Sequence, residues 1–189
     1  MITGRCLLTT LVGLGVMAAA PCAAQEYKIG VSAAITGPVA STYAPTYEGL
    51  KIYIDRLNER GGVNGRQVQV VYLNNQGAPP RAVTDSKRLV DEEKVIALIN
   101  ISTSATYAPM VADARRSRTP LVFLGSAVCP PEVYPPKPDP LLFCSSFNMV
   151  GEDGKAIVHF FKELSGGTKE KLGLLAMDIP ISRQGVDMM

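Results

Sequence analysis

Short apolar runs and helical apolar spacings alternate along the chain, beginning with the stretch from Tyr27 to Gln76. Lys28 to Ala33 is an apolar run of strand length, and Gln67 to Leu73 is a second one. Between them, apolar residues recur at the spacing of one helix face, and Gly61 and Gly62 end that helix, where a left-handed backbone costs least. The helix face comprises Tyr47, Leu50, Ile54 and Leu57. This order predicts two parallel strands joined by a right-handed crossover.

The same alternation continues to the end of the chain. Helices are predicted after Pro79, after Ser104 and around Phe160, and residues 178–189 form a loop that begins one more helix. The buried faces of the first two helices are predicted to be Ala82, Val83, Ser86, Leu89 and Val90, and Tyr107, Met110, Val111 and Ala114. The intervening strands are 95–99, 121–124, 141–144 and 171–176. Continuous apolar strands are typical of a sheet covered on both sides, so the predicted class is α/β, a mainly parallel sheet flanked by helices.

The first 24 residues differ from the rest and predict a secretory signal peptide. Arg5 gives a basic start, Leu7 to Ala20 carries no charge, and cleavage is expected after Ala24. The apolar run is shorter than the roughly 20 residues of a membrane span. A retained anchor is less favoured because nothing polar stops the segment, and a lipoprotein at Cys22 is disfavoured because Pro21 stands where a small residue is needed. The expected location is the periplasm.

Composition and cysteine usage agree with an exported globular protein. Of 189 residues, 47% are hydrophobic and 19% are charged, and the net charge of +2 indicates no nucleic-acid partner. Cys129 and Cys144 remain after the signal peptide and predict a disulfide in an oxidising compartment. A metal site is the rival interpretation, but two cysteines without a nearby histidine are a poor ligand set.

The best candidate for binding chemistry is the tripeptide Ser102-Thr103-Ser104. It follows a predicted strand and precedes a predicted helix, so free backbone N–H groups and hydroxyls favour an anion such as a carboxylate. The alternative is an ordinary helix cap, because every helix needs one. Residues 34–46 share the same edge of the sheet, where α/β proteins bind ligands.

One stretch also resembles a known family. The segments IGVSAAITGPVA and ERGGVNGRQVQVV, separated by a helix, are similar to the opening of bacterial solute-binding proteins of the branched-chain amino acid transporter type. The resemblance implies a type I periplasmic-binding-protein-like fold, with lobe one at 25–147 and the start of lobe two at 148–189. It also implies an ABC permease of the inner membrane as partner. The family's two lobes need a longer chain, so a truncated protein is expected.

The resemblance implies a ligand site between the lobes. Ser104 matches the serine that holds the carboxylate of amino-acid ligands. Ser126, Ala127 and Val128 match the loop that holds the ligand's amino and carboxylate groups, but Val128 stands where amino-acid binders carry threonine. Valine cannot accept a hydrogen bond from an ammonium group.

Two further segments complete the implied site. Thr42 and Tyr43, in the loop after GPVA, match a position where an aromatic ring faces the ligand's side chain. Asp178 and Ser182 match the closing side of lobe two, where Ser182 replaces a frequent tyrosine. The ligand expected from the resemblance is a branched-chain amino acid or a related small carboxylate, with an aromatic acid also open.

Enzyme chemistry has little support in the sequence. No nucleophile–base pair or catalytic motif stands out, no cofactor or metal site is expected, and the single histidine, His159, is expected at the surface. The alternatives to a binding protein are a secreted α/β enzyme, which needs an activated nucleophile or a metal, and a non-functional truncated remnant.

Overall fold

The computed structural model describes residues 25–125, 129–134, 136–145, 152–166, 171, 173–176 and 178–187. Its centre is a five-stranded sheet in the order β2-β1-β3-β4-β5, with every neighbouring pair parallel. The strands are β1 (Tyr27–Ala33), β2 (Val68–Asn74), β3 (Ala97–Ile101), β4 (Leu121–Phe123) and β5 (Leu142–Cys144). The predicted α/β class with a parallel sheet is confirmed.

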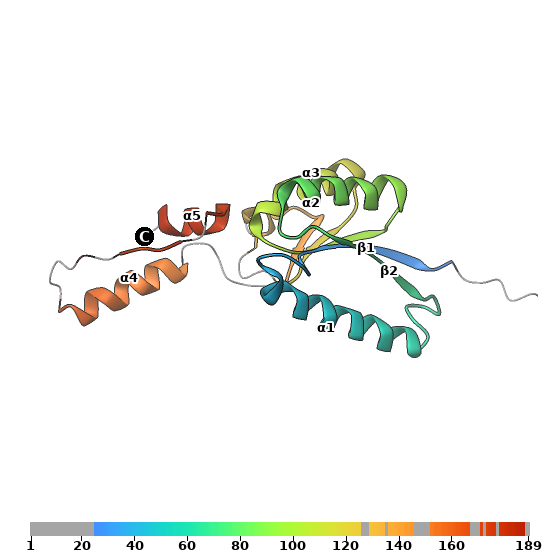
Figure 1. Ribbon diagram of the computed structural model, residues 1–189, viewed down its shortest axis with the longest axis horizontal. Helices are drawn as coiled ribbons and strands as arrows, with labels where there is room; N and C mark the ends of the chain where they lie inside the picture. The colour runs from blue at the N-terminus through green and yellow to red at the C-terminus, as the bar shows by residue number, and fades with distance from the viewer. Residues whose placement is uncertain are drawn as a thin grey trace, which may run out of the picture.

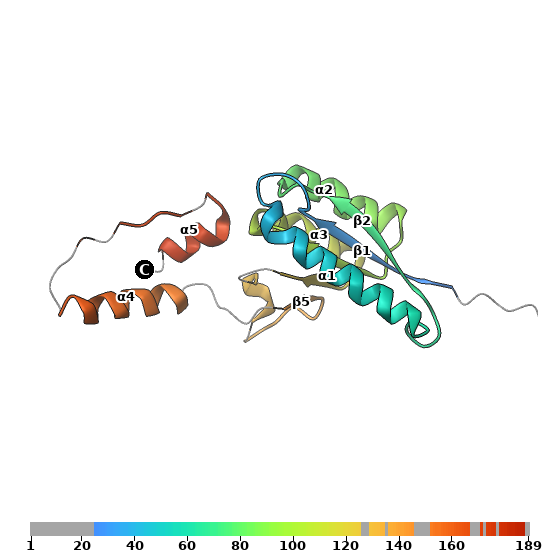
Figure 2. The same cartoon turned by 60° about the horizontal axis from the view of Figure 1, so that its bottom comes forward.

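Two layers of helices cover the sheet. Helix α1 (Ala40–Glu59) lies on one face, and α2 (Pro79–Lys87) and α3 (Tyr107–Ser117) lie side by side on the other (Figure 1). The shorter helical segments are η1 (Arg88–Glu92), η2 (Ser104–Thr106) and η3 (Pro131–Val133). Beyond the sheet come α4 (Glu152–Leu164) and α5 (Pro180–Asp187), on the side toward which the strands point (Figures 1 and 2).

Each face of the sheet has its own core. Under α1, the buried residues Val31, Ala33 and Ile101 pack with half-buried aromatic side chains of α1 and β2. The opposite core is larger, and the rings of Tyr107 and Phe123 lie 4.5 Å apart within it. Its buried members are Leu89, Val90, Val95, Leu98, Tyr107, Met110, Val111, Ala114, Leu121, Phe123 and Leu142. The predicted buried face of α3 is confirmed, because all four of its residues are buried.

The register brings the carboxyl ends of the strands to one edge. Ala33 of β1 pairs with both Asn74 of β2 and Ile101 of β3, and Phe123 of β4 pairs with Cys144 of β5. We call this edge, with the loops that follow the strands, the carboxyl edge. It is where ligands bind in parallel α/β sheets.

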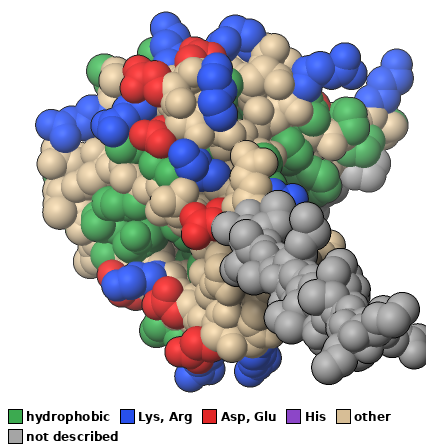
Figure 3. All heavy atoms as spheres, turned by 90° about the vertical axis from the view of Figure 1, so that its right-hand side faces the viewer, with side chains coloured by type: hydrophobic (Ala, Val, Ile, Leu, Met, Phe, Trp, Pro, Cys, Tyr) green, Lys and Arg blue, Asp and Glu red, His purple; other side chains and the backbone are tan. Residues whose placement is uncertain are grey.

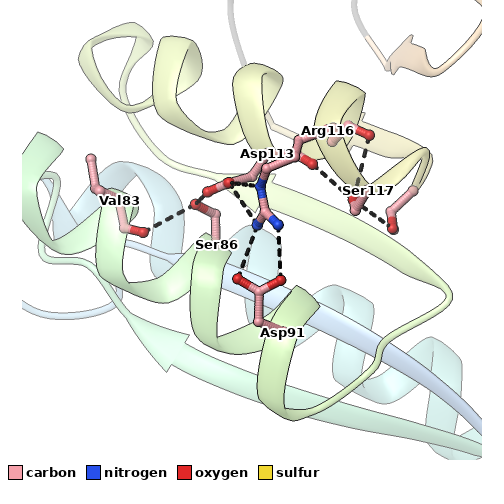
Figure 4. Close-up of polar contacts among 8 residues, drawn as sticks. Val83, Ser86, Asp91, Asp113, Arg116 and Ser117 are labelled. Carbon is pink, nitrogen blue, oxygen red and sulfur yellow. Dashed lines mark hydrogen bonds and ion pairs between the residues drawn. The ribbon is translucent and has the colours of Figure 1, made fainter.

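A polar clamp holds α2, η1 and α3 together on the larger core (Figure 4). The Arg116 guanidinium donates two hydrogen bonds of 3.0 Å to the Asp91 carboxylate and also pairs with Asp113. The Ser86 hydroxyl of α2 lies 2.5 Å from Asp113 Oδ2. Asp113 is buried, so these partners offset the desolvation of its charge.

One predicted strand boundary and one predicted buried position are wrong. The strand predicted at 95–99 runs from Ala97 to Ile101, because Lys94 takes a left-handed φ of 54° and Val95 donates to the Leu89 carbonyl (3.2 Å), which extends the preceding turn. Val83 was predicted to be buried but is 36% exposed.

The strand predicted at 171–176 is also wrong for the residues described there. Lys171 and residues 173–176 have no strand conformation, and Leu175 is fully exposed. A parallel strand forms only by pairing with a neighbour, and no described strand pairs with this segment. The predicted boundary between the lobes, at residues 147 and 148, lies outside the described residues.

Candidate functional site

A cavity of about 360 Å³ begins at the carboxyl edge, at η2, and follows one face of α3 as far as Arg115 in its last turn. The helical side contributes Ser104, Tyr107 and Val111. The segment after Cys129 and helix α5 contribute the other walls, including Glu132 and Gln184. The cavity therefore joins the edge of the parallel sheet to the segment that contains the other predicted contacts.

Of the three residues after β3, Ser102 and Thr103 lie in the interior and Ser104 lies at the cavity. Ser102 is fully buried and donates to Asn75 Oδ1 (2.9 Å), and Thr103 is buried with no hydrogen-bond partner for its Oγ1 among the described residues. Ser104 is half-buried and lines the cavity. The alternative interpretation, a hydroxyl that caps the helix, is wrong: η2 precedes α3, and neither has a side-chain cap hydrogen bond.

The segment Thr42-Tyr43 does not lie in a loop, as predicted, but in the first turn of α1. Helix α1 begins at Ala40 and contains Pro45, whose missing N–H removes a single helical hydrogen bond. Thr42 is exposed, and Tyr43 packs, half-buried, against the core under α1. Burial raises the pKa of the Tyr43 hydroxyl above its ordinary value. Neither residue lines the cavity.

Ser126, Ala127 and Val128 lie outside the described residues, but their loop begins in a defined place. Gly125 has a φ of +72°, and a Cβ there would lie 2.7 Å from Thr46 Oγ1 of α1. Its N–H points at Ser145 Oγ (3.4 Å), just after β5. The loop after β4 therefore starts in close contact with α1 at the carboxyl edge, and only glycine fits there.

Asp178 and Ser182 lie near the cavity without lining it. Asp178 is exposed and pairs with Arg183 of its own segment. Ser182 is half-buried in α5. The residues of this segment that reach the cavity are Pro180 and Gln184, which sequence reasoning missed.

The cavity wall after β4 is fastened by a disulfide and an ion pair. Cys129 and Cys144 form the predicted disulfide, with their Cα atoms 6.0 Å apart. Arg115 of α3, itself a cavity residue, donates to Asp139 Oδ2 (2.7 Å). The Leu141 N–H and the Arg115 guanidinium, in that order of importance, lower the pKa of Asp139. The Pro-rich loop is thus tied to both β5 and α3.

Other hollows lie away from the carboxyl edge. One of about 240 Å³ lies between α1 and β2 and includes Ile54 and Val68. Another, of about 610 Å³, lies at the amino ends of the strands beside Tyr27 and Glu93. Figure 3 views that end of the molecule, where basic and acidic side chains are mixed, so no charge of one sign marks it for a ligand.

Two further chemical possibilities can be judged on the described part of the chain. It contains no group of three or more His, Cys, Asp or Glu side chains that could hold a metal ion. None of the helices in that part combines the length and apolarity that a membrane span needs.

Comparisons with known proteins agree with this fold. The family model for "periplasmic binding protein" matches residues 26–189. Leu/Ile/Val-binding protein homolog 4 of Brucella abortus is 31% identical over 104 residues, which make up 54% of this chain and 24% of that protein. The chain thus matches about a quarter of that curated relative's length.

Two solved structures are similar. The branched-chain amino acid transporter substrate-binding protein LivJ from Streptococcus pneumoniae, in complex with isoleucine, has a TM-score of 0.60 at 25% identity, over 74% of this chain and 38% of that one. A solute-binding protein of an ABC transporter from Rhodopseudomonas palustris, in complex with 3,4-dihydroxybenzoic acid, has a TM-score of 0.68 at 16% identity, over 86% and 42%. The second likeness shows the fold alone.

The resemblance stated from the sequence is therefore confirmed. The parallel sheet with its carboxyl edge and the match over residues 26–189 both support the same family. The relatives are solute-binding proteins rather than enzymes. The chain belongs to the periplasmic binding protein family, and its relatives are of the branched-chain amino acid type.

Proposed function

We propose that this chain is the solute-binding component of an ABC importer and that it binds a small carboxylate-bearing ligand in the cavity at the carboxyl edge. The observation that carries the proposal is the cavity itself, because Ser104 of η2 and Gln184 of α5 line one hollow. Such a site lies where parallel sheets bind ligands and is open to contacts from two separate parts of the chain.

The proposed mechanism is closure around the ligand, without chemical change. Residues 25–147 form lobe one and residues 148–189 begin lobe two. A ligand that touches both lobes binds the closed arrangement more tightly than the open one, so binding shifts the population toward closure. The permease in the inner membrane then recognises the closed form.

The proposed ligand is a branched-chain amino acid or a related acid. Backbone N–H groups at the start of the helical segment and the Ser104 hydroxyl suit a carboxylate. Val128 and Ser182 depart from the pattern of amino-acid binders, so an aromatic acid is a second ligand to test. The two similar solved structures hold isoleucine and 3,4-dihydroxybenzoic acid, one of each kind. The contacts proposed beside Ser104 are Ser126, Ala127, Val128, Asp178 and Ser182.

The proposed location is the periplasm, reached through the signal peptide at residues 1–24. The solute-binding relatives support that location. Neither a catalytic step nor a nucleic-acid partner belongs to the proposal.

Calorimetric titration of the full chain with L-isoleucine and with 3,4-dihydroxybenzoate tests the proposal. Ser104→Ala removes a hydroxyl that faces the carboxylate and should weaken binding about tenfold, the effect of losing about 1.4 kcal/mol. Ser117→Ala is the matched control, because Ser117 is also half-buried but does not line the cavity, and its hydroxyl donates to the Asp113 carbonyl (2.8 Å). It should leave the affinity unchanged. Absence of binding to both acids, or equal loss in both variants, contradicts the proposal.

A further inference from the structure

A chain of buried hydrogen bonds crosses the carboxyl ends of β1, β2 and β3. The Ser102 hydroxyl donates to Asn75 Oδ1 (2.9 Å), and the Asn75 side-chain nitrogen donates to Ser32 Oγ (2.9 Å). The Ser32 hydroxyl in turn donates to Asp85 Oδ2 of α2 (2.8 Å). Ser32, Asn75 and Ser102 have no exposed surface. Four polar side chains thus form one connected unit directly behind the turn that carries Ser104.

The direction of every hydrogen bond in this chain is determined at its two ends. The backbone N–H of Gly77 can only donate, and it lies 2.8 Å from Asn75 Oδ1, so the oxygen of the amide must face it. That oxygen accepts only, so Ser102 must donate to it. At the other end an ionised Asp85 accepts only, so Ser32 donates to Asp85 and accepts from Asn75.

Asn75 is also held at the end of β1, and the loop that contains it lies close to two other segments. Its backbone N–H donates to the Ala33 carbonyl at the end of β1 (3.0 Å). Gly77 has a φ of +75°, and a Cβ there would lie 2.9 Å from Val39 Cγ2 and 3.8 Å from Thr103 Cγ2. The loop after β2 therefore contacts both the segment before α1 and the turn after β3.

We propose that Asn75 is the positioning residue of the candidate site: it holds Ser102 and thereby fixes the turn 102–104 at the rim of the cavity. This inference rests on the proposed function, because it assigns Asn75 to the site that Ser104 lines. The hydroxyl hydrogen of Ser102 is committed to Asn75, so Ser102 supports the site from behind and Ser104 faces the ligand. Asn75 acts through Ser102 and does not touch the ligand.

Amide hydrogen exchange tests the positioning without any ligand. The Thr106 N–H donates to the Thr103 carbonyl (3.0 Å) and reports on the turn. Asn75→Ala should speed exchange at Thr106 about tenfold more than at Val68. Asn58→Ala is the matched control, because the Asn58 side chain makes two hydrogen bonds, against three for Asn75, and both reach Val68 at the opposite end of β2. That variant should speed exchange at Val68 and leave Thr106 unchanged.

A second variant distinguishes positioning from mere stabilisation. Asn75→Asp has the same shape, but its ionised carboxylate cannot donate to Ser32, whereas its protonated form can. Affinity for L-isoleucine relative to the unchanged chain should fall about tenfold near pH 7 and recover at about pH 4 to 5. Asp85 faces position 75 through Ser32, and the charged or titratable groups around Asp85 are Arg81, Arg88 and Tyr72.

The outcomes separate this inference from the proposed function. Equal exchange at Thr106 in Asn75→Ala and Asn58→Ala overturns the positioning role, and so does an Asn75→Asp affinity that does not depend on pH. If the unchanged chain binds no L-isoleucine, the proposed function fails for that ligand. Exchange at Thr106 then still decides whether Asn75 fixes the turn.

Discussion

At the level of single residues, Asp85 shows how burial changes a titration. Burial raises the pKa of its carboxyl group, while the Ser32 hydroxyl, Arg81 and Arg88 partly offset that rise. The folded state then binds this proton more tightly than the unfolded state does. Between the ordinary carboxyl pKa of about 4 and the raised value, the free energy of unfolding therefore falls as pH rises.

The variant Asp85→Asn removes this titration and keeps an oxygen that can accept from Ser32. We expect its stability relative to the unchanged chain to increase as the pH rises above about 4. Urea unfolding of both chains at a series of pH values measures the difference. A difference that stays constant across the series would show that the folded-state pKa of Asp85 is not raised.

Tyr72 carries a second buried polar group, whose hydroxyl has no hydrogen-bond partner among the described residues. Its ring packs against Tyr47 with centroids 4.5 Å apart, and burial raises the pKa of the hydroxyl to about 12. Tyr72→Phe keeps the ring contact and removes the unpaired group, so it should stabilise the fold by about 1 kcal/mol.

Urea unfolding measures that gain. The matched control is Tyr53→Phe, because Tyr53 of α1 is 64% exposed and its hydroxyl is hydrated in both states. Loss of stability in Tyr72→Phe would mean that the hydroxyl has a partner.

Among the elements, the disulfide-bounded loop illustrates stabilisation through the unfolded state. The bond between Cys129 and Cys144 closes a loop with a sequence separation of 15. A cross-link of that span is worth about 3 kcal/mol in the chain-entropy model, and the prolines inside the loop reduce this gain by stiffening the unfolded chain. We expect the double variant Cys129→Ala with Cys144→Ala to lose about 2 kcal/mol.

Denaturant unfolding with and without a reductant checks this expectation. The unchanged chain in reductant should unfold at the same urea concentration as the double variant. Identical midpoints for the oxidised chain and the double variant would contradict a structural role for the bond.

The elements that could be predicted from sequence are those with a strong periodic signal. Parallel strands covered on both sides are largely apolar, so β1 and β2 stand out despite Lys28 and Gln69, and the sheet class follows from their alternation with helices. The start of α1 was missed because Pro38 and Pro45 indicated a loop, although Tyr43 lies four residues before Tyr47 and continues the apolar face of the helix. In the structure residues 40–46 are helical, and Tyr43 packs against the core under α1.

The candidate site was only partly accessible from sequence for a related reason. Ser104 was found because it follows a buried strand. Asn75 carries no local signal, since its partners Ser102 and Ser32 lie 27 and 43 residues away in sequence. Gln184 is an exposed residue of a short helix, and it lines the cavity only because α5 lies beside η2 in the folded chain. Long-range hydrogen bonds of this kind become visible only when the chain has folded.

For the whole molecule, the proposed function requires that two separate parts of the chain contact one ligand. The cavity is lined both by the helical segment after β3 and by α5. Because the chain belongs to a family of solute-binding proteins, we expect a ligand to bind there. Neither part encloses a ligand alone, so contacts from both are what closure requires.

Amide chemical shifts of the full chain during titration with L-isoleucine, and separately with 3,4-dihydroxybenzoate, show whether both parts of the chain contact one ligand. With at least one of these acids, the signals of Ser104 and Ala105 and those of Gln184 should shift together and saturate at the same ligand concentration. Shifts confined to the amino ends of the strands, around Tyr27 and Lys28, or no shifts with either acid, would contradict a ligand site shared by η2 and α5.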